Sequence, residues 1–600
     1  MSTAVQPVSD IPGDAPGDAS QWIVPAFLLA ATLAVYGRTV GFQFVFDDTT
    51  FILANPFVQS AANIPRFFTE SVWSGIAIAR QNYYRPVFLL WVLGNYALFG
   101  AHPAGWHAAA LLLHCLNTAM VYLVALRLVR RPLAAGAGAA LFALHPVQAE
   151  AVSWICCGND LLACFFALAA FLTYLRAVES YGWRSFAWWG GSLASYAAAA
   201  LSKEPAVGVP ALILFHEWSG RAAVRARPEN GAATPARRSL RVGWYFGIAA
   251  VYFLLRRNAL GAWLVGPAPV TGTGTELLTI PSVLFAQLSH LVWPVNLSPF
   301  YDLSYERVLS FRGVVLPSLL LVIPAGLVGW AAVRSAAARF SVAWAALFLV
   351  PTLDIAALPR GELVHDRYLY LPMAGVGMLA AVGIAAVTRN WSEAPEATRR
   401  GRHTFAWTAG VMLAALGLVC WHQTGYWSNN FELFRRGVEI APQNGIAAGN
   451  LGIEYMKVGD RATATELLRQ AAALNPDIWE ADKQQAYVHY RAGRFKEAEQ
   501  VLEVLLATRP DDGFCHLLLG LTYLKTGRPT QAVEEGRRAV ALSPHEAGLH
   551  YGLATILEAT GDLEGARAEY KAELALRPNH QPSLEKLREL DQKLGSVPGH

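Results

Sequence analysis

Long apolar segments separated by short polar loops fill the first 421 residues, and they constrain the fold more than any other feature. Runs such as 105–126 and 313–333 are typical of membrane-crossing helices, since about 20 apolar residues span the roughly 30 Å hydrocarbon core. The other runs interpreted as long enough are 22–36, 160–177, 184–201, 242–259, 339–357, 368–388 and 403–421. Hydrophobic residues make up 54% of the chain and charged residues only 15%. A soluble domain carries about 25% charge, so a wholly cytosolic enzyme and a disordered protein are both excluded.

The charge and cysteine content exclude two further classes of protein. The formal net charge of +4 is small for 600 residues, and the basic residues do not gather in one segment. No nucleic-acid partner is therefore expected, because binding to a phosphate backbone requires concentrated positive charge. The 6 cysteines lie mostly in apolar stretches, so no disulfide framework is predicted.

The charges of the loops predict how the helices cross the membrane, since cytoplasmic loops carry an excess of Lys and Arg. The short runs 132–145 and 204–218 are counted as spans because tilt or local thinning can accommodate them. The runs 86–99 and 281–293 are counted as not crossing, since helices of that length reach only roughly 21 Å. The five basic loops then lie in the cytoplasm, and Arg256 and Arg257, at the outer end of a span, are the exception. This predicts about eleven spans, a disordered cytoplasmic segment 1–21, and a C-terminal domain on the outer side.

The chain changes character after Trp427 and contains a 34-residue repeat. Two residue types recur at this spacing: Pro442, Pro476, Pro510, Pro544 and Pro578, and Gly459, Gly493, Gly527 and Gly561. A 34-residue period is typical of the tetratricopeptide unit, a helix pair that buries its core against neighbouring units. The predicted fold is therefore all-α, a polytopic membrane helix bundle followed by a soluble solenoid. Its parts are a bundle at 22–426, a partial repeat or linker at 427–442, four repeats at 443–590 and a tail at 591–600.

Polar residues collect at the helix ends that this topology places on the outer side. The first outer loop, 38–104, carries Asp47 and Asp48 shortly after the first span. Later outer turns add His145, Glu150, Asp160, Lys203, Glu204, Arg256, Arg360, His365, Asp366 and Arg367. Carboxylates surrounded by cations at the head-group level suit a lipid-linked anionic substrate. A carboxylate can take a proton from a hydroxyl nucleophile while the cations stabilise a departing phosphate.

Six sequence segments occur in a fixed order: FDDTTFILANPFV, YYRPVFLLWVLGNYALFG, LHPVQAEAVSWICCGNDLLA, LSKEPAVGVP, LVWPVNLSPFYDLSY and HDRYLYLP. In this order they resemble the family of membrane proteins with transmembrane and tetratricopeptide repeats, within the GT-C class of glycosyltransferases. The resemblance covers nearly the whole chain, repeats included. It implies a polyprenyl-phosphate sugar donor, most often mannose, and a Ser or Thr hydroxyl of an outer-compartment protein as acceptor.

The resemblance also implies roles for particular residues. The essential carboxylate of the GT-C pattern lies in the first outer loop, here Asp47 or Asp48, and Asp160 matches a second acidic position. The chain departs from the family at Cys157 and Gly158, where Gly-Arg often precedes that second aspartate, so an expected cation is missing. In the expected mechanism, Asp47 or Asp48 takes the acceptor proton and the polyprenyl phosphate leaves in one inverting displacement.

The remaining site residues are expected to bind the donor or to support the carboxylates. Candidates to hold the phosphate are Lys203, Arg256, Arg360 and Arg367, and supporting roles are expected for Glu150, Glu204, His145, His365 and Asp366. Paired aspartates could bind a divalent cation, although the resemblance does not require one. Structural interpretations stay open: a loop or cap role for the Asp pair, a packing role for His145, and local ion pairs of Lys203 with Glu204 and of Arg360 and Arg367 with Glu362 and Asp366.

Three alternatives to a protein glycosyltransferase stay open: a lipid-linked glycan ligase, a transporter or flippase of lipid-linked sugars, and a non-catalytic scaffold. Few charges lie within the spans, which argues against transport. The repeats are expected to bind the acceptor protein or peptide, or else to mediate assembly. Abundant Ala and Arg favour a bacterial inner membrane, with the site and repeats in the periplasm. In a eukaryote the same topology would place them in the lumen of the endoplasmic reticulum.

Overall fold

The protein is described by a computed structural model. It describes residues 20–74, 83–224, 235–261, 272–355, 358, 361–389, 391, 396–474, 479, 483, 486–487 and 489–595. These residues form helices and connecting turns without a β-strand, which confirms the predicted all-α class. Most of the predicted N-terminal segment 1–21 lies outside the described residues. The chain divides near Gly437 into two compact units.

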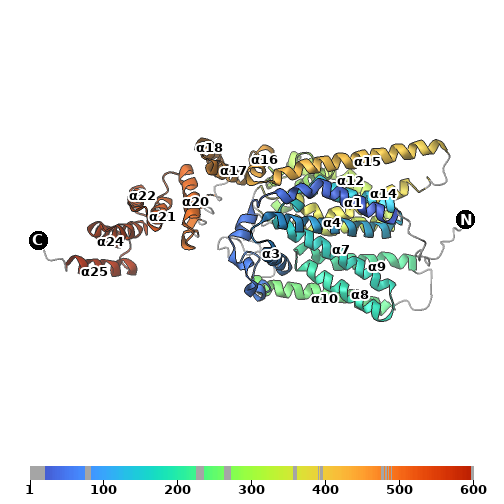
Figure 1. The fold of residues 1–600 in the computed structure, drawn as a ribbon, viewed down its shortest axis with the longest axis horizontal. Helices are drawn as coiled ribbons and strands as arrows, with labels where there is room; N and C mark the ends of the chain where they lie inside the picture. The colour runs from blue at the N-terminus through green and yellow to red at the C-terminus, as the bar shows by residue number, and fades with distance from the viewer. Residues whose placement is uncertain are drawn as a thin grey trace. The chain divides into compact units, whose positions relative to one another are not determined.

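The first unit is a bundle whose long helices run side by side (Figure 1). These helices are α1 (Ser20–Tyr36), α4 (Pro103–Val129), α5 (Pro132–Leu144), α7 (Gly158–Glu179), α8 (Gly182–Ala200), α9 (Val209–Val224), α10 (Pro235–Leu260), α11 (Thr273–Val292), α12 (Leu316–Arg334), α13 (Ala336–Leu349), α14 (Tyr370–Val387) and α15 (Glu396–Thr424). Small residues let some of them approach closely: a Cβ on Gly377 would lie 2.6 Å from the carbonyl oxygen of Gly138. Large apolar side chains such as Leu112, Val322 and Trp407 stay exposed on the outside, as expected of helices that lie in lipid.

Eight helices among the described residues are long and apolar enough to cross a membrane: Trp22–Gly41, Pro103–Val129, Ile155–Glu179, Thr273–Val292, Phe311–Arg334, Ala336–Leu353, Asp366–Val387 and Gly401–Trp427. The sequence predicted about eleven spans. That count included α5, α8, α9 and α10. These four helices are shorter or less apolar than the eight that could cross a membrane. The membrane character of the chain is confirmed, whereas the number of spans is not reproduced.

The prediction that 281–293 is too short to cross is wrong on length. Helix α11 begins at Thr273, before the apolar run, so its 20 residues extend about 30 Å. The apolar run understates the helix because its first turns contain polar residues, among them Glu276, and because Pro281 lies inside the helix without ending it. The run 86–99 is the short helix α3 (Pro86–Phe99), as its length predicts.

Short helices interrupt the chain at the end of the bundle where α1 and α5 finish and α7 begins. They are η1 (Gly37–Gly41), η2 (Thr49–Leu53), η3 (Pro56–Gln59), η4 (Ala61–Asn63), α2 (Ile64–Phe67), η5 (Pro146–Gln148), α6 (Ala149–Ser153), η6 (Ile155–Cys157), η7 (Glu204–Gly208), η8 (Phe311–Val315), η9 (Val350–Leu353), η10 (Asp366–Leu369) and η11 (Gly425–Trp427). Pro56, Pro146 and Pro205 lie in the first turn of three of them. Proline favours a helix start because it fixes φ and needs no intrahelical partner for its nitrogen. These turns carry the candidate site.

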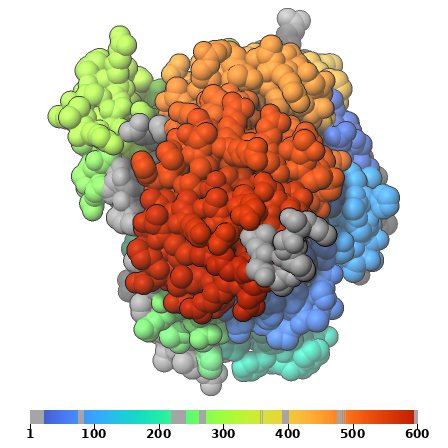
Figure 2. All heavy atoms as spheres, turned by 90° about the vertical axis from the view of Figure 1, so that its left-hand side faces the viewer, coloured from blue at the N-terminus to red at the C-terminus, as the bar shows by residue number. Residues whose placement is uncertain are grey.

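The second unit consists of paired helices, shown from outside in orange to red in Figure 2. Helix α16 (Asn430–Ile440) begins in the first unit and runs past Gly437. The helices after it are α17 (Gly445–Val458), α18 (Arg461–Leu474), α20 (Phe495–Thr508), α21 (Gly513–Lys525), α22 (Pro529–Leu542), α23 (Leu549–Thr560), α24 (Leu563–Leu576) and α25 (Gln581–Gly595). The four periodic glycines Gly459, Gly493, Gly527 and Gly561 all have positive φ. Glycine adopts this left-handed conformation without a Cβ clash, so the period marks the turn between helices of a pair.

Candidate active site

Five of the polar residues that the sequence assigned to one face take part in buried or half-buried ion pairs. The paired residues come from the segment before α3, from α6, from the first turn of α7, from the start of η7 with the residue before it, and from η10. The pairs are Arg85 with Glu204, Lys203 with Asp160, and Arg367 with Glu150. The local ion pair between Lys203 and its neighbour Glu204, one of the open alternatives, is therefore not what forms.

Asp48 is held by the backbone. Its Oδ1 accepts a hydrogen bond from the N–H of Cys156 at 2.9 Å, and its Oδ2 accepts one from the N–H of Val45 at 3.1 Å. The side chain is fully buried. Burial raises the pKa of Asp48 to about 7, while the hydrogen bonds from Cys156 and Val45 oppose that rise. Asp48 therefore ties the first loop to the η6 turn.

Asp47 differs from its neighbour because no hydrogen bond from the described residues reaches its carboxylate. The side chain is partly exposed. Its desolvated surroundings raise the pKa of Asp47 to about 6, and the positive charge of Arg367 limits the rise. At neutral pH this carboxylate is mostly ionised and available to accept a proton.

Lys203 and Asp160 form the most deeply buried of the ion pairs. The Lys203 Nζ lies 2.6 Å from both carboxylate oxygens of Asp160. Burial lowers the pKa of Lys203, whereas the Asp160 charge raises it in part. The Lys203 ammonium also lies 5.7 Å from the centre of the Tyr368 ring. A charge that is desolvated and already paired is fixed in position, which suits an electrostatic role at a reacting centre.

Arg367 is fixed by Glu150 and by two aromatic rings. Its NH1 donates to Glu150 Oε1 at 2.5 Å, and its backbone N–H donates to Glu150 Oε2 at 3.1 Å. Its guanidinium lies 4.9 Å from the centre of the Trp154 ring and 5.3 Å from that of Tyr368. Burial raises the pKa of Glu150, and the Arg367 charge lowers it in part. The expected supporting role of Glu150 is thus to hold this arginine.

The remaining predicted residues are mostly structural or lie elsewhere. The Asp366 carboxylate accepts from the Tyr301 hydroxyl at 2.9 Å and lies 2.9 Å from His290 Nδ1, so it does not pair with Arg367. His145 accepts the N–H of Val147 and contacts the Leu291 carbonyl oxygen at 3.1 Å, which supports its structural interpretation. The buried His365 ring lies near Glu150, at 3.9 Å. Arg256 lies on α10 near Glu204, and Arg360 lies outside the described residues.

Sequence reasoning did not assign a role to two residues that the structure places in this network. Arg85 pairs with Glu204 at 2.7 Å across 119 positions of sequence. Trp154 stacks on Trp427 with ring centres 5.7 Å apart, and its buried indole N–H has no partner among the described residues. Their positions in polar outer loops were the available signal, but their partners lie far away in sequence.

Among the described residues, no three His, Cys, Asp or Glu side chains converge as a metal site.

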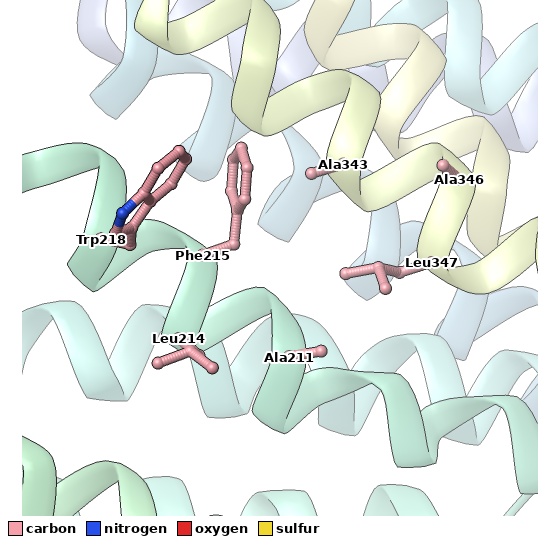
Figure 3. A pocket seen from close by; sticks show the side chains of 7 residues that line it. All are labelled: Ala211, Leu214, Phe215, Trp218, Ala343, Ala346 and Leu347. Atoms are coloured by element: carbon pink, nitrogen blue, oxygen red, sulfur yellow. The ribbon is translucent and has the colours of Figure 1, made fainter.

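A separate apolar groove of about 530 Å³ lies between α9 and α13 (Figure 3). Leu214, Phe215 and Trp218 line it from α9, with small Ala343 and Ala346 opposite. Ala211 and Leu347 complete the lining near the start of α9. The helix α9 follows η7 directly, and Gly208 of η7 packs on Leu347. The groove therefore begins close in sequence to Lys203 and Glu204.

Comparison with known proteins confirms the repeat domain. A family model described as tetratricopeptide repeat matches residues 450–513 and 517–580. Among solved structures, a tetratricopeptide protein called YrrB is 20% identical and aligns with 28% of this chain and 86% of its own, with a TM-score of 0.20. That score is too low to support a structural argument.

The similarity to curated proteins extends well beyond the repeats. The Homo sapiens protein O-mannosyl-transferase TMTC3 is 22% identical over 95% of this chain, and the chain covers 70% of its length. The Homo sapiens TMTC1 is 26% identical over 70% of this chain, and the chain covers 51% of its length. The Mus musculus TMTC4 is 25% identical over 73% of this chain, and the chain covers 64% of its length. These relatives confirm the resemblance that the ordered sequence segments indicated.

Proposed function

We propose that this chain, which resembles protein O-mannosyl-transferases along most of its length, is a GT-C type membrane glycosyltransferase. It moves mannose from a polyprenyl-phosphate donor to Ser or Thr hydroxyls of proteins. The observation that carries the proposal is Asp47, a partly exposed carboxylate with a pKa of about 6 beside the fixed cation of Arg367. A base and a phosphate-binding cation at one place are what this displacement needs.

Asp47 rather than Asp48 is the general base. In the proposed step, Asp47 takes the proton of the acceptor hydroxyl as its oxygen attacks the anomeric carbon. The bond between that carbon and the phosphate oxygen breaks, and its electron pair leaves with the polyprenyl phosphate. Configuration inverts in this single step, and no covalent intermediate with the enzyme forms. Asp48 cannot do the same without losing its hydrogen bonds to Val45 and Cys156.

Arg367 and Lys203 stabilise the departing phosphate. The ion pair with Glu150 engages the Arg367 NH1, and an arginine has five N–H donors, so donors remain to face a phosphate. Glu150 and Asp160 keep the two cations in place before the donor binds, so little reorganisation is needed during the reaction. Arg256 and Arg360 are additional candidates for the same charge.

The groove between α9 and α13 receives the isoprenoid chain of the donor. Its lining is apolar, and the groove lies on helices of the membrane bundle. Its start at Ala211 follows the phosphate-binding segment, Lys203 and Glu204, by a few residues. A lipid chain in this groove would place its phosphate near that segment.

The same proposal includes two further parts. The site faces the outer, periplasmic side, and the repeats bind acceptor proteins.

The test is sugar transfer by the purified full-length protein in lipid vesicles. A polyprenyl-phosphate mannose donor should yield O-linked mannose on an acceptor protein, whereas a nucleotide-linked mannose should not. Asp47→Asn should lower the rate of transfer by about 10²- to 10⁴-fold. The matched carboxylate control is Glu179→Gln, which should leave transfer unchanged. Glu179 is the last residue of α7, at the opposite end of this helix from Asp160. Folded wild-type protein that transfers nothing from any polyprenyl-phosphate sugar would contradict the proposal.

A further inference from the structure

Phe46, the residue before Asp47, has an unusual backbone conformation. Its φ is 51°, in the left-handed region that residues with a Cβ rarely adopt. Among the described non-glycine residues, only Arg130 shares a positive φ. Such a conformation persists only where surrounding contacts hold it, and it often occurs at functional sites.

Contacts from a distant part of the chain hold Phe46. Its N–H donates to the Oδ1 of Asn430 at 2.8 Å, across 384 positions of sequence. Three residues before it, the N–H of Gln43 donates to the carbonyl oxygen of Ser428 at 3.0 Å. The Phe46 ring packs on Trp154 at 5.4 Å and on Phe434 at 5.8 Å, measured between ring centres.

Asn430 is itself fixed on a well-anchored helix. It is the first residue of α16, and Asn429 caps this helix by accepting the N–H of Glu432 at 3.0 Å. Arg436, further along α16, donates to the carbonyl oxygens of Leu297 and Val295, each at 3.3 Å. The Asn430 amide therefore presents its oxygen to Phe46 from a rigid support.

We propose that Asn430 is a positioning residue for Asp47, which rests on the proposed function of Asp47 as the base. The hydrogen bond to the Phe46 N–H keeps Phe46 at positive φ, and that conformation directs the next side chain toward Arg367. Without the bond, Phe46 relaxes to negative φ and the Asp47 carboxylate moves. A displacement of about 1 Å at a reacting group can cost 10²-fold in rate. The start of α16, which belongs to the first unit, thus helps to build the active site.

The experiment compares Asn430→Ala with Asn429→Ala in the full-length protein. Asn429→Ala removes the helix cap but not the bond to Phe46, so it controls for destabilised α16. We expect Asn430→Ala to lower kcat by tenfold or more with little change in the KM of the donor. It should also increase hydrogen exchange of the peptide spanning 42–53. Asn429→Ala should do neither.

A rescue variant separates positioning from a packing role. Asn430→Asp keeps an acceptor oxygen for the Phe46 N–H, so kcat should stay within about threefold of wild type. Its added negative charge near Asp47 should shift the acid limb of the pH–rate profile upward. Equal kcat losses in both alanine variants, or unchanged exchange of 42–53 in Asn430→Ala, would overturn the inference. A wild-type protein without transferase activity would contradict the proposed function instead, and the exchange measurement would still decide whether Asn430 holds this segment.

Discussion

The Nζ of Lys203 lies 2.6 Å from both carboxylate oxygens of Asp160, and both side chains are buried. The charge of Asp160 is therefore already matched inside the protein. Asp47 lies 11 positions after the end of α1 and has no such partner among the described residues. The two acidic side chains thus differ in their surroundings: Asp160 is paired with a cation, whereas Asp47 is the one that we propose accepts a proton.

Breaking the Lys203–Asp160 pair should destabilise the bundle strongly. Asp160→Asn leaves an uncompensated buried ammonium, which costs about 3 to 5 kcal/mol. The double variant Asp160→Leu with Lys203→Met removes both charges and should recover most of this stability, but not the transferase activity. Denaturant unfolding in detergent measures the effect. Glu179→Gln, which breaks the exposed pair with Arg127, should cost at most about 1 kcal/mol. Equal losses for the two pairs would refute the buried role.

The neighbouring aspartates should separate activity from stability. Asp47→Asn removes a base without losing a hydrogen bond, so the protein should fold normally while kcat falls by about 10²- to 10⁴-fold. Asp48→Asn keeps only one acceptor oxygen for the N–H groups of Val45 and Cys156, so it should lower the free energy of unfolding by about 1 to 3 kcal/mol. Parallel kinetics and unfolding experiments test this. A folded Asp47→Asn enzyme with wild-type kcat would remove Asp47 as the base.

The rate should depend on pH through the protonation of Asp47. The Asp47 pKa is raised to about 6, so the base is protonated below that pH and ionised above it. The value of kcat/KM should therefore rise from pH 5 to pH 7 with an apparent pKa of about 6. Measuring kcat/KM in vesicles across this pH range gives the apparent pKa of the acid limb. An acid limb near pH 4 would mean that an ordinary exposed carboxylate is the base.

The repeat domain should lose stability as pH rises because of two equivalent histidines. His516 bonds to Glu535 and His550 to Glu569, in positions related by the 34-residue period. Burial lowers the pKa of each histidine, but the hydrogen bond to glutamate, the bond to a backbone carbonyl and the glutamate charge together outweigh burial and raise the pKa above 6.5. Their contribution, about 0.5 to 1 kcal/mol each, is fully present below pH 6.5 and is lost as pH rises through the raised pKa.

Hydrogen exchange of α21–α24 in the full chain, corrected for the intrinsic rate, measures this dependence. Protection should fall between pH 6.5 and pH 8.5. His516→Gln with His550→Gln should flatten the dependence, since glutamine does not titrate. A dependence that persists in this double variant would assign it to other groups.

Filling the groove between α9 and α13 should weaken binding of a long-chain donor. Ala346→Trp fills part of the groove from the α13 side, so the KM for a polyprenyl donor should rise about tenfold while kcat changes little. A donor with a short isoprenoid chain should bind as well to this variant as to wild type. Val322→Trp, on the exposed side of α12, is the matched control. An unchanged KM for the long donor would remove this groove as the site of its lipid chain.

Several residues of the site could be found from the sequence, but their partners could not. The spacing of apolar runs and basic loops placed Asp47, Asp160, Lys203 and Arg367 on one side of the bundle, and the structure joins all four in an ion pair or an electrostatic contact. The same reasoning paired Arg367 with nearby acidic residues, whereas Glu150 binds it from 217 positions away. Sequence proximity is a weak guide where helices cross and return.

The sequence by itself determined the all-α class, the membrane character and the repeat, because apolar length and a 34-residue period are local properties of the chain. The tertiary structure alone decided which of the two aspartates has its carboxylate held by backbone hydrogen bonds. That choice depends on the N–H groups of Val45 and Cys156, which bind Asp48, and on Asn430, which holds Phe46 beside Asp47. Hydrogen bonds between distant segments leave no periodic signal in the sequence, since each depends on the packing of helices that only the folded chain brings together.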